Sequence, residues 1–400
     1  MLCVRTALSV MAGHSPVERR AFFRTPYVPA IHAAPLPANQ KLFWRPDHID
    51  DRDKPGHDGV GFLSRSPRRL KFWLVALALM PAALGLVPDS ASADAPVCRG
   101  HDLSRNPDVK PDLAAHADEL VNSEGLLWRV EKPGLATSYL YGTIHSTNPA
   151  AISLAGEAIA YLGGAKVVAT ELGGPMDSAA KADLGAGMLR AALSPKEDTL
   201  AGALSAKDLG VVDAFLGARG YPEEMSHHLK LWFLAVASSL PLCEAEAVEK
   251  GLPEVDEVIA EFGQGHGLPV VALETVAEQT QTLMSVPNKL AATMLLATAR
   301  APDINDDAYV TLLSLYSQKR PALAIALLDA LPGLSQEERS AEAEFTRLLL
   351  VGRNELMMKR SAPLFAKGGA FVAVGALHLA GKGGLIERAR AAGYRVTKIW

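Results

Sequence analysis

Two histidines in this sequence each follow a glycine by three residues, directly after a short apolar segment. The motif GTIH (142–145) comes after residues 139–141, and GALH (375–378) comes after residues 370–374. Imidazole titrates near neutral pH and is a common ligand of divalent metals. The repeated spacing marks His145 and His378 as candidate site residues. We expect each glycine to let the strand turn sharply without a clash at Cβ.

Two glutamates follow apolar segments in the same way. Glu171 comes after residues 166–170 and Glu274 after residues 269–273. Open α/β sheets bind ligands at the carboxyl ends of their strands, so all four side chains are expected at one edge. Two histidines and a carboxylate can bind a divalent metal, and without a metal they can perform acid–base catalysis. Glu274 is the less specific candidate, because it could simply begin the helix that follows.

The elements that must position these residues alternate between strands and helices. Residues 126–130 and 139–141 predict a hairpin, and residues 395–399 predict a terminal strand. Residues 166–170, 269–273 and 370–374 are β-branched segments typical of strands buried on both faces. Helical patterns cover residues 177–193, 222–240, 252–261, 276–298, 309–331 and 337–360. The sequence therefore predicts an α/β fold: a mixed central sheet flanked by helices, with a large helical insertion between the inner strands.

Composition and charge exclude several classes of protein. The chain has 400 residues, three cysteines and a mean hydropathy of +0.11. It has no 20-residue apolar segment of a polytopic membrane protein, and too few cysteines for a disulfide-rich or Cys-rich metal scaffold. After residue 93 there are 28 Lys and Arg against 37 Asp and Glu, without a basic cluster. Nucleic acid is therefore not the expected partner.

The first 93 residues are expected to lie outside the folded domain. Residues 64–93 combine a basic segment, an apolar segment and the small-residue site ASA (91–93), which is typical of a cleaved signal peptide. Residues 1–63 show no periodicity and are interpreted as translated upstream sequence or a disordered segment. Residues 94–400 would then form a periplasmic or secreted protein with no membrane span after cleavage near Ala93. An uncleaved N-terminal anchor is the alternative.

Export also affects the cysteines. Cys3 lies in the upstream segment, which leaves Cys98 and Cys243 in the exported chain. An even number of cysteines in an oxidising compartment favours a disulfide. We predict a Cys98–Cys243 bridge, with two free thiols as the alternative.

Five segments resemble the TraB/GumN family, which includes the Tiki proteases. The stretches are SYLYGTIHSTNPA (138–150), VVATEL (167–172), PVVALETVAEQ (269–279), GRNELMMKR (352–360) and FVAVGALHLAGKGGLIERARAAGYRV (371–396). The resemblance implies the α/β fold shared with erythromycin esterases and ChaN-type haem-binding lipoproteins. Nothing here resembles the C-terminal membrane anchor of Tiki proteins.

The resemblance also implies roles for particular residues. In the Tiki branch the equivalents of His145, His378 and Glu171 hold a divalent metal, such as Mn, Co or Zn, and act in a protease. Arg353 and Asn354 match the family's RN motif and could bind a substrate carboxylate or an oxyanion. The expected function is a metal-dependent hydrolase acting on a peptide or small-molecule substrate. The alternatives are a metal-independent hydrolase of the esterase type and a haem- or metal-binding protein without turnover.

Overall fold

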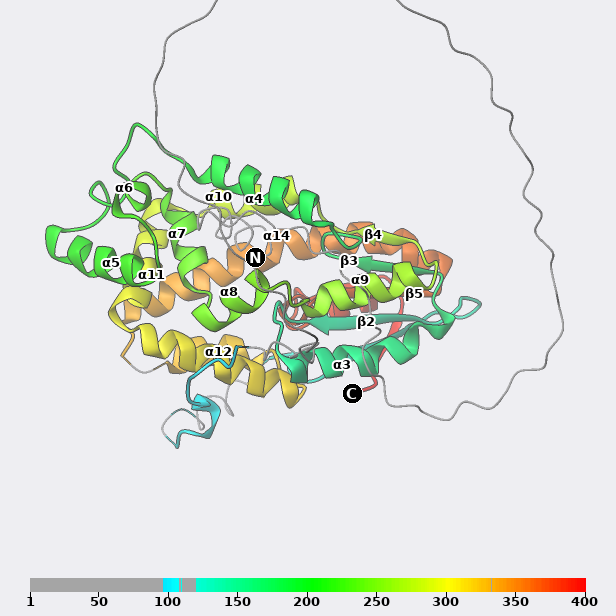
Figure 1. Ribbon diagram of the computed structural model, residues 1–400. Coiled ribbons are helices and arrows are strands. Elements are labelled where there is room, and N and C mark those ends of the chain that lie inside the picture. The colour runs from blue at the N-terminus through cyan, green and yellow to red at the C-terminus, as the bar shows by residue number, and fades with distance from the viewer. Residues whose placement is uncertain (1–95, 108, 110–119, 332) are drawn as a thin grey trace, which may run out of the picture. The chain divides into compact units, whose positions relative to one another are not determined.

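The computed structural model describes residues 96–107, 109, 120–331 and 333–400. The predicted signal peptide (64–93) and upstream segment (1–63) lie outside the described residues. Six strands form one mixed sheet in the order β4-β3-β5-β2-β1-β6 (Figure 1). Their bounds are β1 (Leu127–Glu131), β2 (Ser138–Thr143), β3 (Val167–Thr170), β4 (Val270–Ala272), β5 (Ala370–Gly375) and β6 (Arg395–Lys398).

The middle of the sheet is parallel and its outer part is antiparallel. Strand β5 lies between β3 and β2, parallel to both, and β4 runs parallel to β3. The predicted hairpin is confirmed, because β1 pairs antiparallel with β2, and β6 pairs antiparallel with β1. Each predicted strand exists within two residues of its expected bounds. The apolar side chains of β5 are buried on both faces of the sheet, as the unbroken pattern AFVAV indicated.

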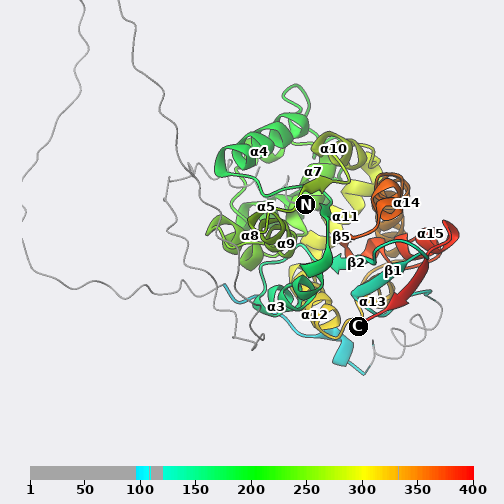
Figure 2. The same ribbon diagram turned by 90° about the vertical axis from the view of Figure 1, so that its right-hand side faces the viewer.

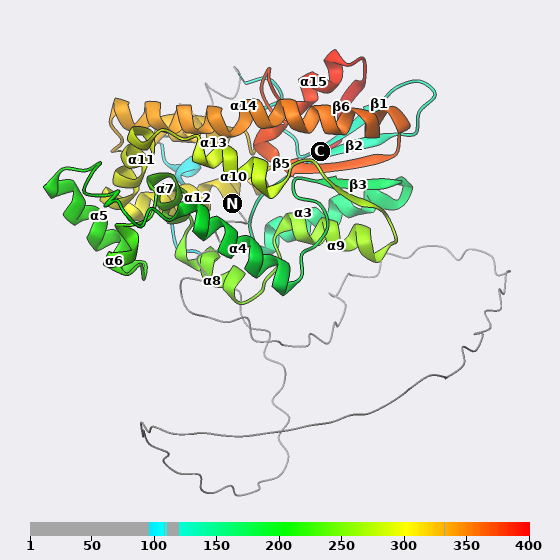
Figure 3. The ribbon, with the colours of Figure 1, turned by 90° about the horizontal axis from the view of Figure 1, so that it is seen from above.

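Helices cover both faces of the sheet (Figure 3). On one face, α3 (Pro149–Ile159) and α9 (Val255–Gly265) pack in a core that includes Tyr141 and Phe371. On the other face, α14 (Gln336–Lys367) and α15 (Leu385–Ala391) share a core with Val372 and Val374. Short 3-10 helices cover residues Leu103–Arg105, Ala160–Gly164 and Ala376–His378.

The remaining helices form the predicted insertion beside the sheet (Figures 1 and 2). Between β3 and β4 lie α4 (Ser178–Ala192), α5 (Ala206–Ala218), α6 (Glu223–Ser226), α7 (Leu231–Ser238), α8 (Leu242–Glu249) and α9. Between β4 and β5 lie α10 (Val276–Met284), α11 (Asn288–Arg300), α12 (Pro302–Ser317), α13 (Leu323–Ala330) and α14. Their core includes Phe233, Leu234 and Leu295.

Several predicted helices are shorter than expected. The predicted helix 222–240 is two helices, because residues 227–230 leave the helix and Leu229 forms an isolated β-bridge with Leu193. The predicted helix 276–298 ends at Met284, and Pro287 is the N-cap of the next helix. Proline has no backbone N–H to donate, so it is not favoured inside a helix. The predicted helix 309–331 is likewise divided into α12 and α13 before Pro321.

The segment before β1 is attached to the helical insertion. Cys98 and Cys243, which are 145 positions apart in the sequence, form a disulfide. Beyond the bridge, this segment lies along α12, where Leu103 donates its backbone N–H to Thr311 Oγ1 at 2.7 Å. Among the described residues, no single helix is long and apolar enough to cross a membrane. Helices α7 and α8 have that length and apolarity only when taken together, and the pair is bent by 90°.

Candidate functional site

Four of the predicted site residues lie at one edge of the sheet, where the parallel strands end. His145 follows β2, Glu171 follows β3, His378 follows β5 and Glu274 follows β4. The long helix α14 passes over the same edge and adds Arg353. The structure thus brings together side chains that are up to 233 residues apart in the sequence, at the edge where we expected them.

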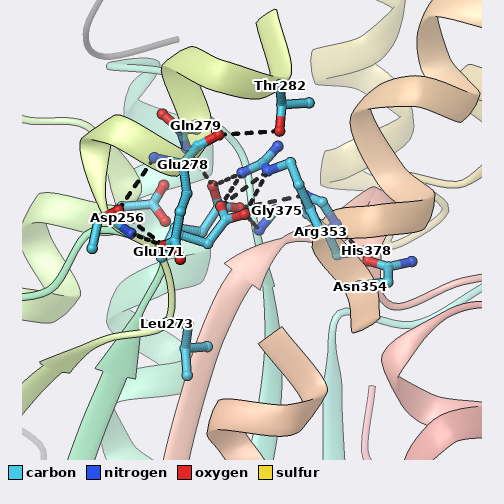
Figure 4. A network of polar contacts seen from close by, with 12 residues as sticks. Glu171, Asp256, Leu273, Glu278, Gln279, Thr282, Arg353, Asn354, Gly375 and His378 are labelled. Atoms are coloured by element: carbon cyan, nitrogen blue, oxygen red, sulfur yellow. Dashed lines mark hydrogen bonds and ion pairs between the residues drawn. The ribbon is translucent and has the colours of Figure 1, made fainter. Parts of the chain in front are cut away.

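Glu171 is at the centre of this group (Figure 4). Its residue is 3% exposed, and its Oε1 accepts the backbone N–H of Gly375 at 2.8 Å. Its Oε2 accepts Arg353 Nη2 at 2.7 Å. The two imidazoles lie just beyond hydrogen-bond distance, with His378 Nε2 3.7 Å from Oε1 and His145 Nε2 3.9 Å from Oε2. Each carboxylate oxygen of Glu171 therefore faces a different histidine.

Arg353 joins Glu171 to Glu274, the second carboxylate of the edge. Its Nε lies 3.0 and 2.9 Å from the two carboxylate oxygens of Glu274, and its Nη2 lies 2.7 Å from Oε2. The Glu274 side chain is 1% exposed and the Arg353 side chain is 12% exposed. Buried charges require partners of this kind, and the planar guanidinium matches two carboxylates at once.

The two glutamates are held in different protonation environments. Burial alone would raise the pKa of Glu171, but Arg353 and the two histidines hold that pKa well below its usual range. Burial raises the pKa of Glu274, and the hydrogen bonds and charge of Arg353 oppose that shift only in part. Glu171 therefore stays ionised to a lower pH than Glu274, and Glu274 is the carboxylate that protonates first as the pH falls.

The hydrogen bonds of His378 fix its tautomer. Its Nδ1 lies 2.6 Å from Asn354 Oδ1, and Asn354 Nδ2 donates to the carbonyl oxygen of Gly383 at 3.1 Å. Because the amide nitrogen of Asn354 is used as a donor, its oxygen must accept, and the proton of the neutral ring is on Nδ1. The lone pair of His378 Nε2 is left facing Glu171.

Burial keeps the His378 ring neutral. It lowers the pKa of His378 to about 4, although the Glu171 carboxylate acts in the opposite direction. In an NMR titration we expect the His378 ring to protonate near pH 4. The unfolded chain binds this proton near pH 6.5. The free energy of unfolding should therefore decrease as the pH is lowered from 6.5 to 4, by up to about 3 kcal/mol. A midpoint near 6.5 for this ring would contradict the assignment.

His145 has an arrangement like that of His378, with a carboxylate in place of the amide. Its Nδ1 lies 3.3 Å from Asp256 Oδ2, and Asp256 Oδ1 accepts the hydroxyl of Thr143 at 2.9 Å. Its Nε2 faces Glu171. The His145 side chain is 25% exposed, against 5% for His378. His145 is thus the histidine that a substrate can reach.

The two glycines of the GxxH motifs are required for a different reason than expected. Gly375 has a φ of −47°, which any residue adopts, so a sharp turn does not explain it. A Cβ at Gly375 would lie 3.1 Å from Glu171 Oε1, and a Cβ at Gly142 would lie 2.9 Å from the Cβ of Ala376. Both glycines therefore allow close packing of the strand ends, and Gly375 lets the carboxylate of Glu171 reach a backbone N–H.

Sequence reasoning missed two residues of the site, Asp256 and Gln279. Asp256 lies in the first turn of α9, where acidic residues are common for reasons of helix stability alone. Gln279 donates its Nε2 to Glu171 Oε2 at 3.3 Å from α10. Neither residue follows a strand, so no pattern in the sequence separated them from ordinary helix residues.

A pocket opens on this group of side chains. It is lined by His145, Glu171, Asp256 and Gln279, by residues 172–176, which follow β3, and by Glu254, Glu257 and Ala260 of the α9 region. Water and a small substrate group can therefore reach the imidazole of His145 and the carboxylate of Glu171. Arg353 and His378 are not among the residues that line the pocket.

The site offers the types of ligand atom that divalent metals bind, but these atoms are not close enough together to hold one ion. Both imidazoles present Nε2 and hold Nδ1 against an oxygen, as metal-bound histidines do. Among the described residues, however, the one trio whose ligand atoms all lie within 4.8 Å of each other is Asp213, Glu223 and His227, on the helical insertion. His145, His378 and Glu171 do not meet this criterion together, so their side chains would have to shift to bind a common ion.

The comparisons with known proteins bear on the whole arrangement. The model of the TraB/PrgY/gumN family matches residues 126–398, from the first strand to the last. No curated protein and no solved structure gives a significant match. The matched region includes every residue of the site. The chain belongs to the TraB/PrgY/gumN family.

Proposed function

We propose that this protein is a hydrolase of peptide-like or ester bonds in which Glu171, His145 and His378 activate a water molecule. The observation that supports this most is that both imidazoles have Nδ1 against an oxygen and Nε2 toward one ionised carboxylate. Such an arrangement has no evident use in packing, since it places three titratable groups together beside a pocket.

In the metal-free form of this proposal, the chain's own residues divide the proton transfers. Glu171, kept ionised, accepts a proton from a water in the pocket as the water oxygen attacks the substrate carbonyl carbon. His145, the exposed imidazole, gives a proton from Nε2 to the leaving amine or alcohol when the carbon–nitrogen or carbon–oxygen bond breaks. His378, buried and neutral, accepts the Glu171 proton at Nε2 while the product leaves. That proton then returns through Glu171 to Nε2 of His145, which restores both groups for the next turnover.

Arg353 and Asn354 are positioning residues in this mechanism. The family resemblance suggests that they bind substrate, but their hydrogen bonds in the described structure are to Glu171, Glu274, His378 and Gly383. Arg353 keeps Glu171 ionised and correctly oriented. Asn354 keeps the His378 proton on Nδ1, so that the lone pair stays on Nε2.

A divalent metal such as Mn, Co or Zn is part of the proposal. His145, His378 and Glu171 would hold it through two Nε2 atoms and a carboxylate oxygen. When bound, such an ion lowers the pKa of a coordinated water and polarises a carbonyl. The remaining ligand positions would be open to water and substrate.

One observation favours a second candidate, a hydrolase of the same type without a metal. Arg353 Nη2 already occupies Glu171 Oε2 at 2.7 Å, and this cation neutralises the carboxylate that a metal would need. In the metal-free form, Glu171 and the imidazoles carry out the proton transfers alone. The substrate in either case is a peptide or a small molecule. We propose that the protein acts on it outside the cytoplasm.

Metal analysis of the purified protein decides between the two candidates. With a metal, the wild type should hold close to one ion per chain, lose it in His145→Ala and His378→Ala, and lose hydrolysis on treatment with EDTA. Without a metal, hydrolysis should survive EDTA and still be lost in both variants. His266→Ala is the matched control, because His266 is exposed at the end of α9.

Two results of the same experiment would contradict a hydrolase that uses these two histidines. One is hydrolysis that is unchanged in both histidine variants. The other is a Soret band on addition of haemin to the wild type, together with no turnover of any peptide or ester. That second result would favour the binding protein implied by the resemblance to ChaN-type proteins.

A further inference from the structure

Another buried carboxylate lies close to the site but outside it. Glu244 is on α8, directly after Cys243, and is 2% exposed. Its Oε1 accepts the backbone N–H of Thr147 at 2.7 Å, and its Oε2 accepts the hydroxyl of Tyr309. Tyr309 comes from α12, so two helices of the insertion meet at this carboxylate.

The segment that Glu244 and Tyr309 hold is the one that carries His145. Ser146 is fully buried, and its hydroxyl lies 2.8 Å from the hydroxyl of Tyr309. Thr147 is 7% exposed and is held through its backbone N–H. The backbone on the C-terminal side of His145 is therefore fixed by side chains from α8 and α12.

Helix α12 also holds the other side of the same segment. Tyr316 donates its hydroxyl to the carbonyl oxygen of Gly142 at 2.8 Å, at the end of β2. This tyrosine is 1% exposed. Residues 142–147 are thus held by α12 before His145 and by α8 and α12 after it, which leaves little freedom for the backbone that positions the imidazole.

The disulfide connects these two helices through a third segment. Cys243 is the neighbour of Glu244 on α8, and its partner Cys98 begins the segment that lies along α12. Several hydrogen bonds attach that segment to α12, among them His101 N–H to Asp307 Oδ1, Leu103 N–H to Thr311 Oγ1, and Ser314 Oγ to Asp102 Oδ2. The bridge therefore links α8 to the helix that supplies Tyr309.

We propose that Glu244 and Tyr309 are positioning residues for His145, and that the Cys98–Cys243 disulfide keeps them in place. Hydrolysis then depends on the oxidised bridge. The effect on hydrolysis rests on the proposed function, whereas the effect on the backbone of residues 146–147 does not. Reduction by a dithiol supplies two electrons and two protons, converts the bridge to two thiols and releases α8 from the segment on α12.

Amide hydrogen exchange at Thr147 tests the positioning role without any substrate. In Glu244→Ala the Thr147 N–H loses a charged acceptor, and we expect its protection to fall roughly tenfold or more. In Glu244→Gln the remaining amide oxygen can still accept this N–H, so most of the protection should be kept. Glu246→Ala, an exposed change on the same helix, is the matched control and should leave exchange at Thr147 unchanged.

Hydrolysis by the same variants separates positioning from binding. We expect kcat of Glu244→Ala to fall roughly 100-fold, as small displacements of reacting groups do. KM should stay within about threefold, because neither Glu244 nor Tyr309 lines the pocket. Glu244→Gln should restore most of kcat. Tyr309→Phe, which keeps the ring and removes the hydroxyl, should lie between them, and it tests the proposal if Glu244→Ala does not fold.

The bridge is tested by dithiothreitol and by the double variant Cys98→Ser/Cys243→Ser. Both should lower the protection of Thr147 and lower kcat, and dithiothreitol should have no further effect on the double variant. Unchanged Thr147 protection and kcat in the reduced protein would overturn the role of the bridge. Unchanged Thr147 protection in Glu244→Ala or Tyr309→Phe would overturn the positioning role. If the wild type hydrolyses nothing, the proposed function fails and Thr147 exchange still decides the positioning role.

Discussion

Arg353→Met is expected to lower the free energy of unfolding at pH 7 by about 3–5 kcal/mol, because it removes the arginine that pairs with two buried carboxylates, Glu171 and Glu274. The side chains of Glu171 and Glu274 are 4% and 1% exposed, so neither can be solvated by water instead. Chemical denaturation of the purified variant and the wild type measures the difference.

The loss should depend on pH in a stated direction. Burial already raises the pKa of Glu274, and without Arg353 that pKa rises further, so Glu274 takes up a proton as the pH falls. The difference between wild type and Arg353→Met should therefore be smaller at pH 5 than at pH 7. Arg347→Met is the matched control on the same helix, since the Arg347–Glu344 pair is exposed and should contribute less than about 1 kcal/mol. Equal losses in the two variants would contradict the buried pairing.

Glu171→Gln is expected to lower kcat/KM by about 10²- to 10⁴-fold, the usual contribution of a positioned acid–base group. The amide keeps the size of the side chain but cannot accept a proton from water at neutral pH. The fold should be retained, because Arg353 keeps three contacts of 2.7 to 3.0 Å with Glu274. We expect the thermal melt to fall only slightly.

The control for this variant is Glu278→Gln. Glu278 is on α10 near the site and pairs with Arg360, but its side chain is 37% exposed and does not contact the histidines. Hydrolysis should be unchanged in Glu278→Gln. A Glu171→Gln protein that unfolds, yet keeps full activity for each folded molecule, would instead assign Glu171 a purely structural role.

The strands could be predicted because their sequence pattern and their burial have the same cause. Segments such as KVVAT and AFVAV are continuous β-branched and apolar segments, and only a strand covered on both faces uses that pattern at this length. Their parallel pairing then placed the residues after each strand at one edge. His145, Glu171, Glu274 and His378 were found by this argument.

The helices were predicted less well, for reasons that can be named. The breaks after Met284 and Ser226 depend on Pro287 and on a β-bridge between Leu193 and Leu229, which is a tertiary contact. The helices α3, α5 and α8 were missed. Two of them, α3 and α5, are rich in Ala and Gly, whose hydrophobic periodicity is weak.

The partners of the site residues were beyond sequence reasoning. Asp256, Gln279 and Glu244 lie on helices from other parts of the chain, and no spacing relates them to His145 or Glu171. Arg353 and Asn354 were found through a family resemblance, and the structure then showed that they contact the glutamates and His378. The bridge between Cys98 and Cys243 was expected from the number of cysteines, and the structure places it between α8 and the segment on α12.

Hydrolysis of a peptide mixture in ¹⁸O-labelled water tests the central claim most directly. A hydrolase of peptide-like bonds should produce new carboxyl termini that each carry one ¹⁸O atom, detectable by mass spectrometry. The account predicts such products with the wild type and with Glu278→Gln, and their loss with Glu171→Gln, His145→Ala and His378→Ala. Labelled termini that appear equally with Glu171→Gln, or no labelled termini with the wild type, would contradict it.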